Sequence, residues 1–215
     1  MAIDDLLDEH EQSERVRSWV RSNALGLIGG IALGLAAIAG LQWWQGQQLR
    51  ERMGVNDRYA QAVQAYQAGA PDPAKARADV AAIAKGNPTL GTLAALQLAK
   101  AQVEGGKRDE AIATLRGLQD VDPDLRAVVD ERLARLLVDA GKGKDALGLL
   151  GDATAPALLD ARGDAHMSLG DRAAAREDYR KALGRVDVGS PQHRLLQLKL
   201  IEAGGTPPHT EDTTR

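Results

Sequence analysis

The chain has 215 residues, no cysteine and no phenylalanine, and its formal net charge at pH 7 is −3. The absence of cysteine excludes disulfides, thiolate metal sites and thiol nucleophiles. Residues 1–23 hold 3 basic and 6 acidic side chains and residues 24–49 hold none, which leaves 24 of each sign in residues 50–215. Because that large part is electrically balanced, it has no overall positive field to attract nucleic acid.

Residues 24–41 form an uncharged run, ALGLIGGIALGLAAIAGL, and Gln42, Trp43 and Trp44 follow it directly. As a helix, residues 24–44 would be about 31 Å long, which matches a bilayer core of about 30 Å. Trp19 precedes the run, so tryptophans stand at both ends, where interfacial aromatic side chains belong. We predict a transmembrane signal-anchor helix over residues 24–44, preceded by an acidic cytoplasmic tail over residues 1–23.

Two other interpretations of this run stay open. A buried helix of a soluble protein rarely continues this long without a charge. A removable signal peptide is the stronger alternative, because Ala37-Ile38-Ala39 has the small-x-small form of a cleavage site. However, the 23 residues before the run begin acidic, whereas a signal peptide opens with basic residues and is usually shorter.

The orientation and the lateral contacts of the helix follow from its flanks and its glycines. Basic residues are slightly more numerous before the run than after it (Arg15, Arg17 and Arg21 against Arg50 and Arg52). By the positive-inside rule, this places the N-terminus in the cytoplasm and the large domain across the membrane. Within the run a doubled G-x-x-x-G pattern predicts a face for close helix contact, although glycine is also simply frequent in membrane helices (Gly26, Gly30 and Gly34).

Residues 45–203 predict antiparallel helix pairs that are joined by glycine-containing turns. A pattern of small residue, glycine, small residue and large residue recurs with offsets of 7, 5 and 4. The small residues let two helices approach closely, and the glycine tolerates the left-handed backbone that ends the first helix. The copies are Ala99, Gly106, Ala111 and Leu115; Ala134, Gly141, Ala146 and Leu150; Gly163, Gly170, Ala175 and Tyr179; and, more weakly, Ala62, Gly69, Ala74 and Ala78.

This pattern resembles the tetratricopeptide repeat, whose period is near 34 residues. The turn glycines from Gly69 to Gly106, Gly141 and Gly170 are 37, 35 and 29 residues apart. The copies are degenerate, because the usual tryptophan of the first helix is missing and Gln102 stands where a tyrosine is common. The expected fold is therefore all-α, a single transmembrane helix followed by a tetratricopeptide-like α-solenoid. A generic helical bundle is the alternative.

Ser190-Pro191 opens a further helix, with serine as the cap and proline at the first helical position. We expect this helix to cap the solenoid and to bury one apolar side. Gly204-Gly205 ends it, and residues 204–215 are polar and expected to be disordered. The apolar side consists of Leu195, Leu196, Leu198, Leu200 and Ile201.

No catalytic arrangement stands out, and we predict a protein that is not an enzyme and that needs no cofactor or metal. The four histidines are widely spaced, and no P-loop, H-E-x-x-H or G-x-S-x-G motif occurs. The concave face of the solenoid is instead the expected binding site for a peptide or helix. By the repeat register its candidate residues are Leu96, Lys100, Val103, Glu131, Arg135, Val138, Asp160, Asp164 and Met167. Glu131 and Arg135 have an alternative interpretation as an ordinary i,i+4 surface pair.

The ordered set of segments resembles the ancillary SecYEG translocon subunit family. The matching stretches are Leu41 to Trp44, Tyr59 to Val63, Gly91 to Ala99, Leu133 to Arg135, and Arg162 to Ala165 with Gly170-Asp171. The resemblance implies a single-pass protein of a bacterial inner membrane with a periplasmic domain. It also implies that the partners are the SecYEG translocon, a PpiD-like periplasmic chaperone and nascent exported polypeptides. An adaptor scaffold in envelope or cell-wall assembly is the alternative function.

Overall fold

The computed structural model of the chain describes residues 4–69 and 72–207. These residues form α-helices and one short 3-10 helix, and no strand occurs among them, which confirms the all-α prediction. The chain divides into an N-terminal unit, Met1–Met53, and a C-terminal unit, Gly54–Arg215. In chain order the elements are α1 (Asp4–Gln67), α2 (Pro73–Gly86), α3 (Pro88–Glu104), α4 (Arg108–Arg116), η1 (Pro123–Leu125), α5 (Arg126–Asp139), α6 (Gly143–Leu150), α7 (Pro156–Ser168), α8 (Arg172–Leu183) and α9 (Pro191–Glu202).

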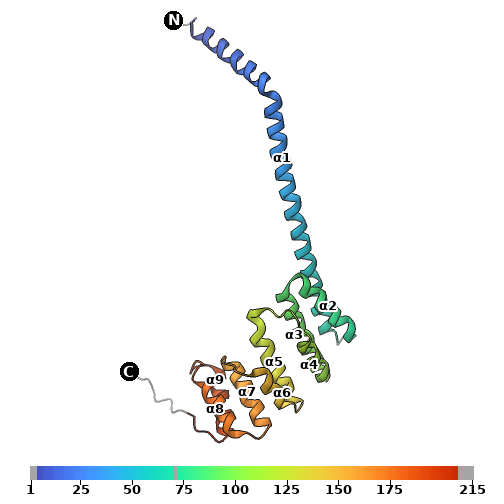
Figure 1. The fold of residues 1–215 in the computed structure, drawn as a ribbon, viewed down its shortest axis with the longest axis vertical. Helices are drawn as coiled ribbons and strands as arrows, with labels where there is room; N and C mark the ends of the chain where they lie inside the picture. The colour runs from blue at the N-terminus through green and yellow to red at the C-terminus, as the bar shows by residue number, and fades with distance from the viewer. Residues whose placement is uncertain (1–3, 70–71, 208–215) are drawn as a thin grey trace, which may run out of the picture. The chain divides into compact units, whose positions relative to one another are not determined.

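The described part of the N-terminal unit is helical, and it forms most of α1, the long helix of Figure 1. From residue 28 onward, α1 is long and apolar enough to cross a membrane, and none of its most apolar window is buried. Leu25 is 91% exposed and Ile28 is 68% exposed, as expected for side chains that face lipid rather than a protein core. Gly26, Gly30 and Gly34 have no atom within 4 Å of the position that a Cβ would take. The limits at residues 24 and 44 stay a prediction.

The C-terminal unit consists of antiparallel helix pairs, which Figure 1 shows most clearly from α5 to α8. The end of α1 shares a buried cluster with α2 and α3, and a second cluster joins α3 to α7. A third cluster holds α7, α8 and α9 together. Each helix pair therefore buries its apolar side against the next pair, as a solenoid requires.

Three of the four predicted repeats are confirmed in detail. Gly106, Gly141 and Gly170 have φ angles of 74°, 71° and 79°. After each glycine, the next backbone N–H bonds back to the carbonyl four residues before the glycine, at 2.7, 2.8 and 2.9 Å. This is the Schellman arrangement, which ends the first helix and lets the second begin two residues later. The predicted small and large residues of these repeats are all buried.

In the first copy the predicted register was wrong by two residues. Ala74 and Ala78 are exposed, whereas Ala76 and Val80 are buried. The turn after α1 is longer, because α2 begins four residues after the glycine at position 69 rather than two. Asp72 caps α2 by accepting hydrogen bonds from two backbone N–H groups at 3.0 and 2.9 Å, so the helix start is moved along the chain.

The last helix, α9, begins and ends where the sequence predicts. The Ser190 hydroxyl accepts a hydrogen bond from the His193 N–H at 3.1 Å, and Gly204 has a φ angle of 83°. The predicted single apolar side, however, is divided between two faces of the helix. Leu196 and Leu200 are fully buried, while the other three aliphatic side chains are exposed (Leu195, Leu198 and Ile201). Of the tail that is expected to be disordered, residues 208–215 lie outside the described residues.

In the third repeat, glycine replaces the small alanine of the first helix and tyrosine replaces the leucine of the second helix. Where the other repeats pair Ala99 with Leu115 or Ala134 with Leu150, this one pairs Gly163 with Tyr179. A Cβ at Gly163 would clash with the ring of Tyr179, which is 2% exposed and would have to shift within the core. The glycine is therefore required by the size of its neighbour.

We predict that Gly163→Ala lowers the free energy of unfolding by about 1–3 kcal/mol, because the buried ring must shift. Adding Tyr179→Leu restores the alanine–leucine pair of the other repeats and should recover part of that loss. Gly148→Ala is the matched control, since Gly148 has open space around it and gains about 0.5–1 kcal/mol of helix propensity. Urea unfolding of the full chain in mild detergent, followed by circular dichroism, measures all three. Equal losses in the single and double variants would contradict the size argument.

Candidate functional site

A groove with a volume of about 730 Å³ lies between α3 and α5. It exists because the two helices are held apart, whereas α5 packs closely on α7. The connection from α4 to α5 spans residues 117–125, against residues 151–155 for the connection from α6 to α7. The longer connection is fixed to α3, since Asp122 bonds to the Thr89 hydroxyl and its backbone N–H donates to the Thr92 hydroxyl at 3.1 Å.

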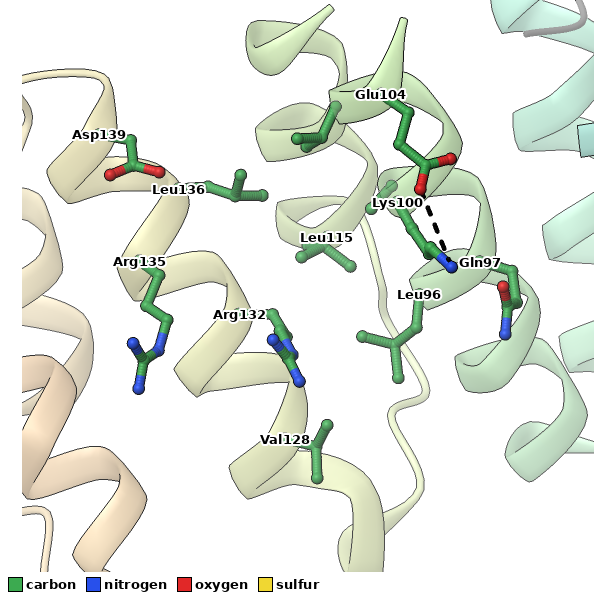
Figure 2. A pocket seen from close by; sticks show the side chains of 12 residues that line it. Leu96, Gln97, Lys100, Glu104, Leu115, Val128, Arg132, Arg135, Leu136 and Asp139 are labelled. Atoms are coloured by element: carbon green, nitrogen blue, oxygen red, sulfur yellow. Dashed lines mark ion pairs between the residues drawn. The ribbon is translucent and has the colours of Figure 1, made fainter. Parts of the chain in front are cut away.

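The α3–α5 groove has an apolar floor and a charged rim (Figure 2). Its floor and walls carry aliphatic side chains from α3, α4 and α5 (Leu96, Ala99, Val103, Leu115, Val128 and Leu136). Lys100 and Arg132 lie midway along it in Figure 2, and both side chains are largely exposed. An open apolar floor between charged edges is the arrangement that a polypeptide segment with apolar side chains would fill.

One end of the groove is acidic. Glu104 is the last residue of α3 and Asp139 is the last residue of α5, and Figure 2 shows both at the same end. A carboxylate in the last helical turn faces the negative end of the helix dipole, which is unfavourable by a few tenths of a kcal/mol to about 1 kcal/mol. For Asp139 no ion pair on the described residues offsets this cost. Both carboxylates lie on the rim of the groove, where Glu104 pairs with Lys100 at 3.8 Å.

Next to the groove, a network of charged side chains joins α5, α7 and α9. Arg135 donates to Glu131 and to Asp160, each at 2.9 Å. Lys199 of α9 donates to Asp160 at 2.7 Å and to Asp164 at 2.8 Å. The carboxylate of Asp160 is almost fully buried, so these cations offset the loss of its hydration. We call these five residues the ion-pair network.

Tyr179 completes the ion-pair network from α8. Its hydroxyl donates to Asp164 at 2.8 Å, and the Lys199 ammonium lies 5.8 Å from the centre of its ring. Burial, together with the negative charge of Asp164, raises the pKa of Tyr179 above its ordinary value. Burial alone lowers the pKa of Arg135, but the carboxylates around it raise the pKa above its ordinary value. Both shifts favour the protonated forms that the hydrogen bonds require.

The structure brings four of the nine candidate groove residues together. Leu96, Lys100, Val103 and Arg135 line the α3–α5 groove. Glu131, Asp160 and Asp164 belong to the ion-pair network instead, and the expectation that Asp160 faces an open groove is corrected by its burial. The last two candidates, Val138 and Met167, pack against the apolar clusters.

Sequence reasoning missed four of the five residues of α5 that line the groove. The wall there consists of Val128, Arg132, Leu136 and Asp139 in addition to Arg135. The repeat register assigned one binding face to α5, but this helix has two, one toward α3 and one toward α7. The spacing of four residues between Val128, Arg132 and Leu136 is the signal that could have identified the second face.

Two histidines of the domain lie in different surroundings, His166 among charged side chains and His193 on the buried side of α9. His166 lies 3.7 Å from Asp178 and 3.8 Å from Asp171, and Arg162 donates two hydrogen bonds to Asp178 at 2.8 and 2.7 Å. His193 belongs to α9 and is buried, with 5% of its surface exposed. Over residues 4–69 and 72–207, no group of three His, Asp or Glu side chains is placed to hold a metal ion.

Comparison with known proteins gives the family of the chain. Residues 17–205 match the family described as tetratricopeptide repeat-like domain. Over 199 residues the chain is 33% identical to the ancillary SecYEG translocon subunit of Escherichia coli (strain K12), which covers 90% of this chain and 95% of that protein. The chain belongs to the ancillary SecYEG translocon subunit family.

A second member, from Aggregatibacter actinomycetemcomitans, is 25% identical over 202 residues, which covers 90% of this chain and 97% of that protein. No solved structure matches the chain. The family resemblance and the tetratricopeptide-like fold that the sequence predicts are both confirmed. This family is one of accessory proteins rather than of a known enzyme class.

We predict that Lys199→Met lowers the free energy of unfolding by about 2 kcal/mol. The substitution removes one of the two cations that contact the buried Asp160 carboxylate. Lys181→Met is the control, because Lys181 pairs with Glu177 at 3.5 Å on an exposed surface and should change stability by less than about 0.5 kcal/mol. Thermal and urea unfolding followed by circular dichroism measure both variants. Equal effects would show that the network contributes no more than a surface ion pair.

Proposed function

We propose that this chain is a non-enzymatic accessory of the SecYEG translocon in the bacterial inner membrane. In this proposal residues 1–23 lie in the cytoplasm, residues 24–44 span the membrane and residues 45–203 lie in the periplasm. The observation that carries it is the identity over nearly the whole chain to a protein named as an ancillary translocon subunit. The exposed apolar helix and the open α3–α5 groove supply the two surfaces that such a role requires.

The membrane helix is proposed to contact the translocon through its glycine face. Gly26, Gly30 and Gly34 recur every fourth residue, so they lie along one side of α1, and no atom of this chain fills the space beside them. Without side chains there, a helix of the translocon can approach closely and gain packing energy that lipid cannot supply.

The α3–α5 groove is proposed to bind an apolar polypeptide segment, either from an exported protein or from a PpiD-like chaperone. Its aliphatic floor would receive the apolar side chains, and the exposed Lys100 and Arg132 would approach a carboxylate or backbone carbonyls. Glu104 and Asp139 would receive a lysine or arginine at the acidic end. Such mixed contacts select a segment by the order of its charges as well as by its apolar content.

We predict that Gly26→Leu, Gly30→Leu and Gly34→Leu together reduce co-purification with SecYEG at least about tenfold, because three side chains block close helix approach. The matched control is Ala32→Leu, Ala36→Leu and Ala39→Leu, which adds three leucines on the opposite side of the same helix. Quantitative immunoblots of the translocon recovered with each tagged full-length chain give the measurement. Equal recovery of translocon with the two triple variants would rule out lateral packing through the glycines.

A photo-crosslinking amino acid at Leu96, in the groove, should capture exported chains or a PpiD-like chaperone in living cells. The same group at Leu169, which is 42% exposed and does not line the groove, should capture far less. Glu104→Lys with Asp139→Lys should reduce the yield at Leu96 several-fold, because it repels the positive charge of the ligand. Capture of envelope-assembly enzymes at Leu96 would instead support the adaptor alternative. Mass spectrometry of the adducts identifies the partner.

A further inference from the structure

The outer face of α9, the last helix of the solenoid, is more apolar than the end of a solenoid usually is. The last helix of a repeat array has no neighbour to stack on it, so its outer side is usually polar. Here Leu195, Leu198 and Ile201 lie on that side and are 47%, 65% and 53% exposed. The inner side is complete without them, because Leu196 and Leu200 are fully buried against α7 and α8.

Among residues 4–69 and 72–207, no element covers the outer face. Residues 203–215, AGGTPPHTEDTTR, come after α9 and contain no large aliphatic side chain. The helices of the α3–α5 groove contribute nothing to this face either, since α9 packs on α8 and reaches α7 through Lys199. An apolar stripe on an ordered helix that the described residues leave exposed indicates a contact with another molecule.

The charged residues beside the apolar stripe indicate which molecule makes this contact. Arg194 stands four residues before Leu198 and Glu202 stands four residues after it, while Leu195 and Ile201 stand three residues before and after it. All five lie on one side of the helix, which has 3.6 residues per turn. Neither Arg194 nor Glu202 takes part in an ion pair within the part of the chain that the structure describes.

We propose that the outer face of α9 binds the same face of a second copy of this chain. Two α9 helices run antiparallel about a two-fold axis at Leu198. Leu198 then packs on the Leu198 of the other copy, and each Leu195 lies against the aliphatic part of the other copy's Glu202. The charged end of that Glu202 lies within reach of Arg194, whose aliphatic part packs on the other copy's Ile201. The sequence is self-complementary in this register, which is what an isologous contact requires. A second copy of this chain matches both the apolar stripe and the charges beside it.

The size of this contact places it among weak interfaces. Three partly exposed aliphatic side chains per copy bury far less than the roughly 1,200 Å² of a standard stable complex. Two copies that are anchored in one membrane, as in the proposed function, meet at a raised effective concentration, which favours a weak dimer. The grooves of both copies remain open, because their lining residues belong to α3, α4 and α5.

The absence of cysteine makes the register directly testable by disulfide crosslinking in native membranes. Under mild oxidation, Leu198→Cys should give a disulfide-linked homodimer of the full chain. Leu195→Cys alone should not, because two copies of position 195 are about 9 Å apart along the helix axes, beyond disulfide reach. Co-expressed Leu195→Cys and Glu202→Cys chains should crosslink to each other, because these two positions lie on the same side of the contact at nearly the same height. Leu149→Cys, at a side chain of α6 that is 36% exposed, is the control for random collision.

Charge reversal tests the same contact independently. In the Leu198→Cys background, Arg194→Glu should reduce the crosslinked fraction at least fivefold, because it sets two carboxylates against each other. Arg194→Glu with Glu202→Arg should restore it, because the pair is reversed rather than removed. Maleimide labelling shows that each thiol is reactive, and circular dichroism of the purified chains shows that each is folded.

Any of three results overturns the proposal. The first is a monomer despite a reactive thiol at position 198, and the second is crosslinking at 195 alone as efficient as at 198. The third is a disulfide from 198 to a different protein, which would assign this face to a heterologous partner. Loss of SecYEG co-purification bears on the proposed function alone and leaves the dimer result unaffected.

Discussion

The solenoid depends on one packing constraint, which is the close approach of the two helices in each pair. At the crossing point the first helix carries Ala99, Ala134 or Gly163, and each of these residues is buried with almost no exposed surface. A larger side chain there would hold the helices apart and expose the apolar layer between pairs. The left-handed turn glycines set the direction of the second helix, so that its own alanine reaches the crossing point.

The distance between successive pairs, rather than the pairing itself, creates the site. Where the connection is long, as over residues 117–125, α3 and α5 remain apart and a groove with an apolar floor stays open. Where the connection is short, as over residues 151–155, α5 and α7 meet, and the ion-pair network fills the equivalent surface. In the sequence, the longer and the shorter connection appear as the two spacings of the turn glycines, 35 and 29 residues.

The sequence predicts the pairing well, because close packing and left-handed turns require particular residue types at fixed offsets. It predicts the face of each helix less well, because a face depends on the neighbour that the helix meets. The register of α2 was wrong since the length of a turn is not written in the repeat pattern. The repeat register assigns Asp160 to the groove, because the sequence does not distinguish a solvated carboxylate of a first helix from a buried one in an ion pair. Only the fold brings Lys199, 39 residues further along the chain, within 2.7 Å of it.

Arg135 lies at the boundary between groove and network, and its bonds decide how it acts. It lines the α3–α5 groove, yet three carboxylates hold its guanidinium, one of them the buried Asp160. Turning it toward a ligand would leave that buried charge with Lys199 alone, which is unfavourable by more than a surface contact returns. Arg135 is therefore a fixed part of the groove wall. Lys100 and Arg132, which are exposed and make only long ion pairs of 3.8 and 4.0 Å, are the cations free to adapt to a bound segment.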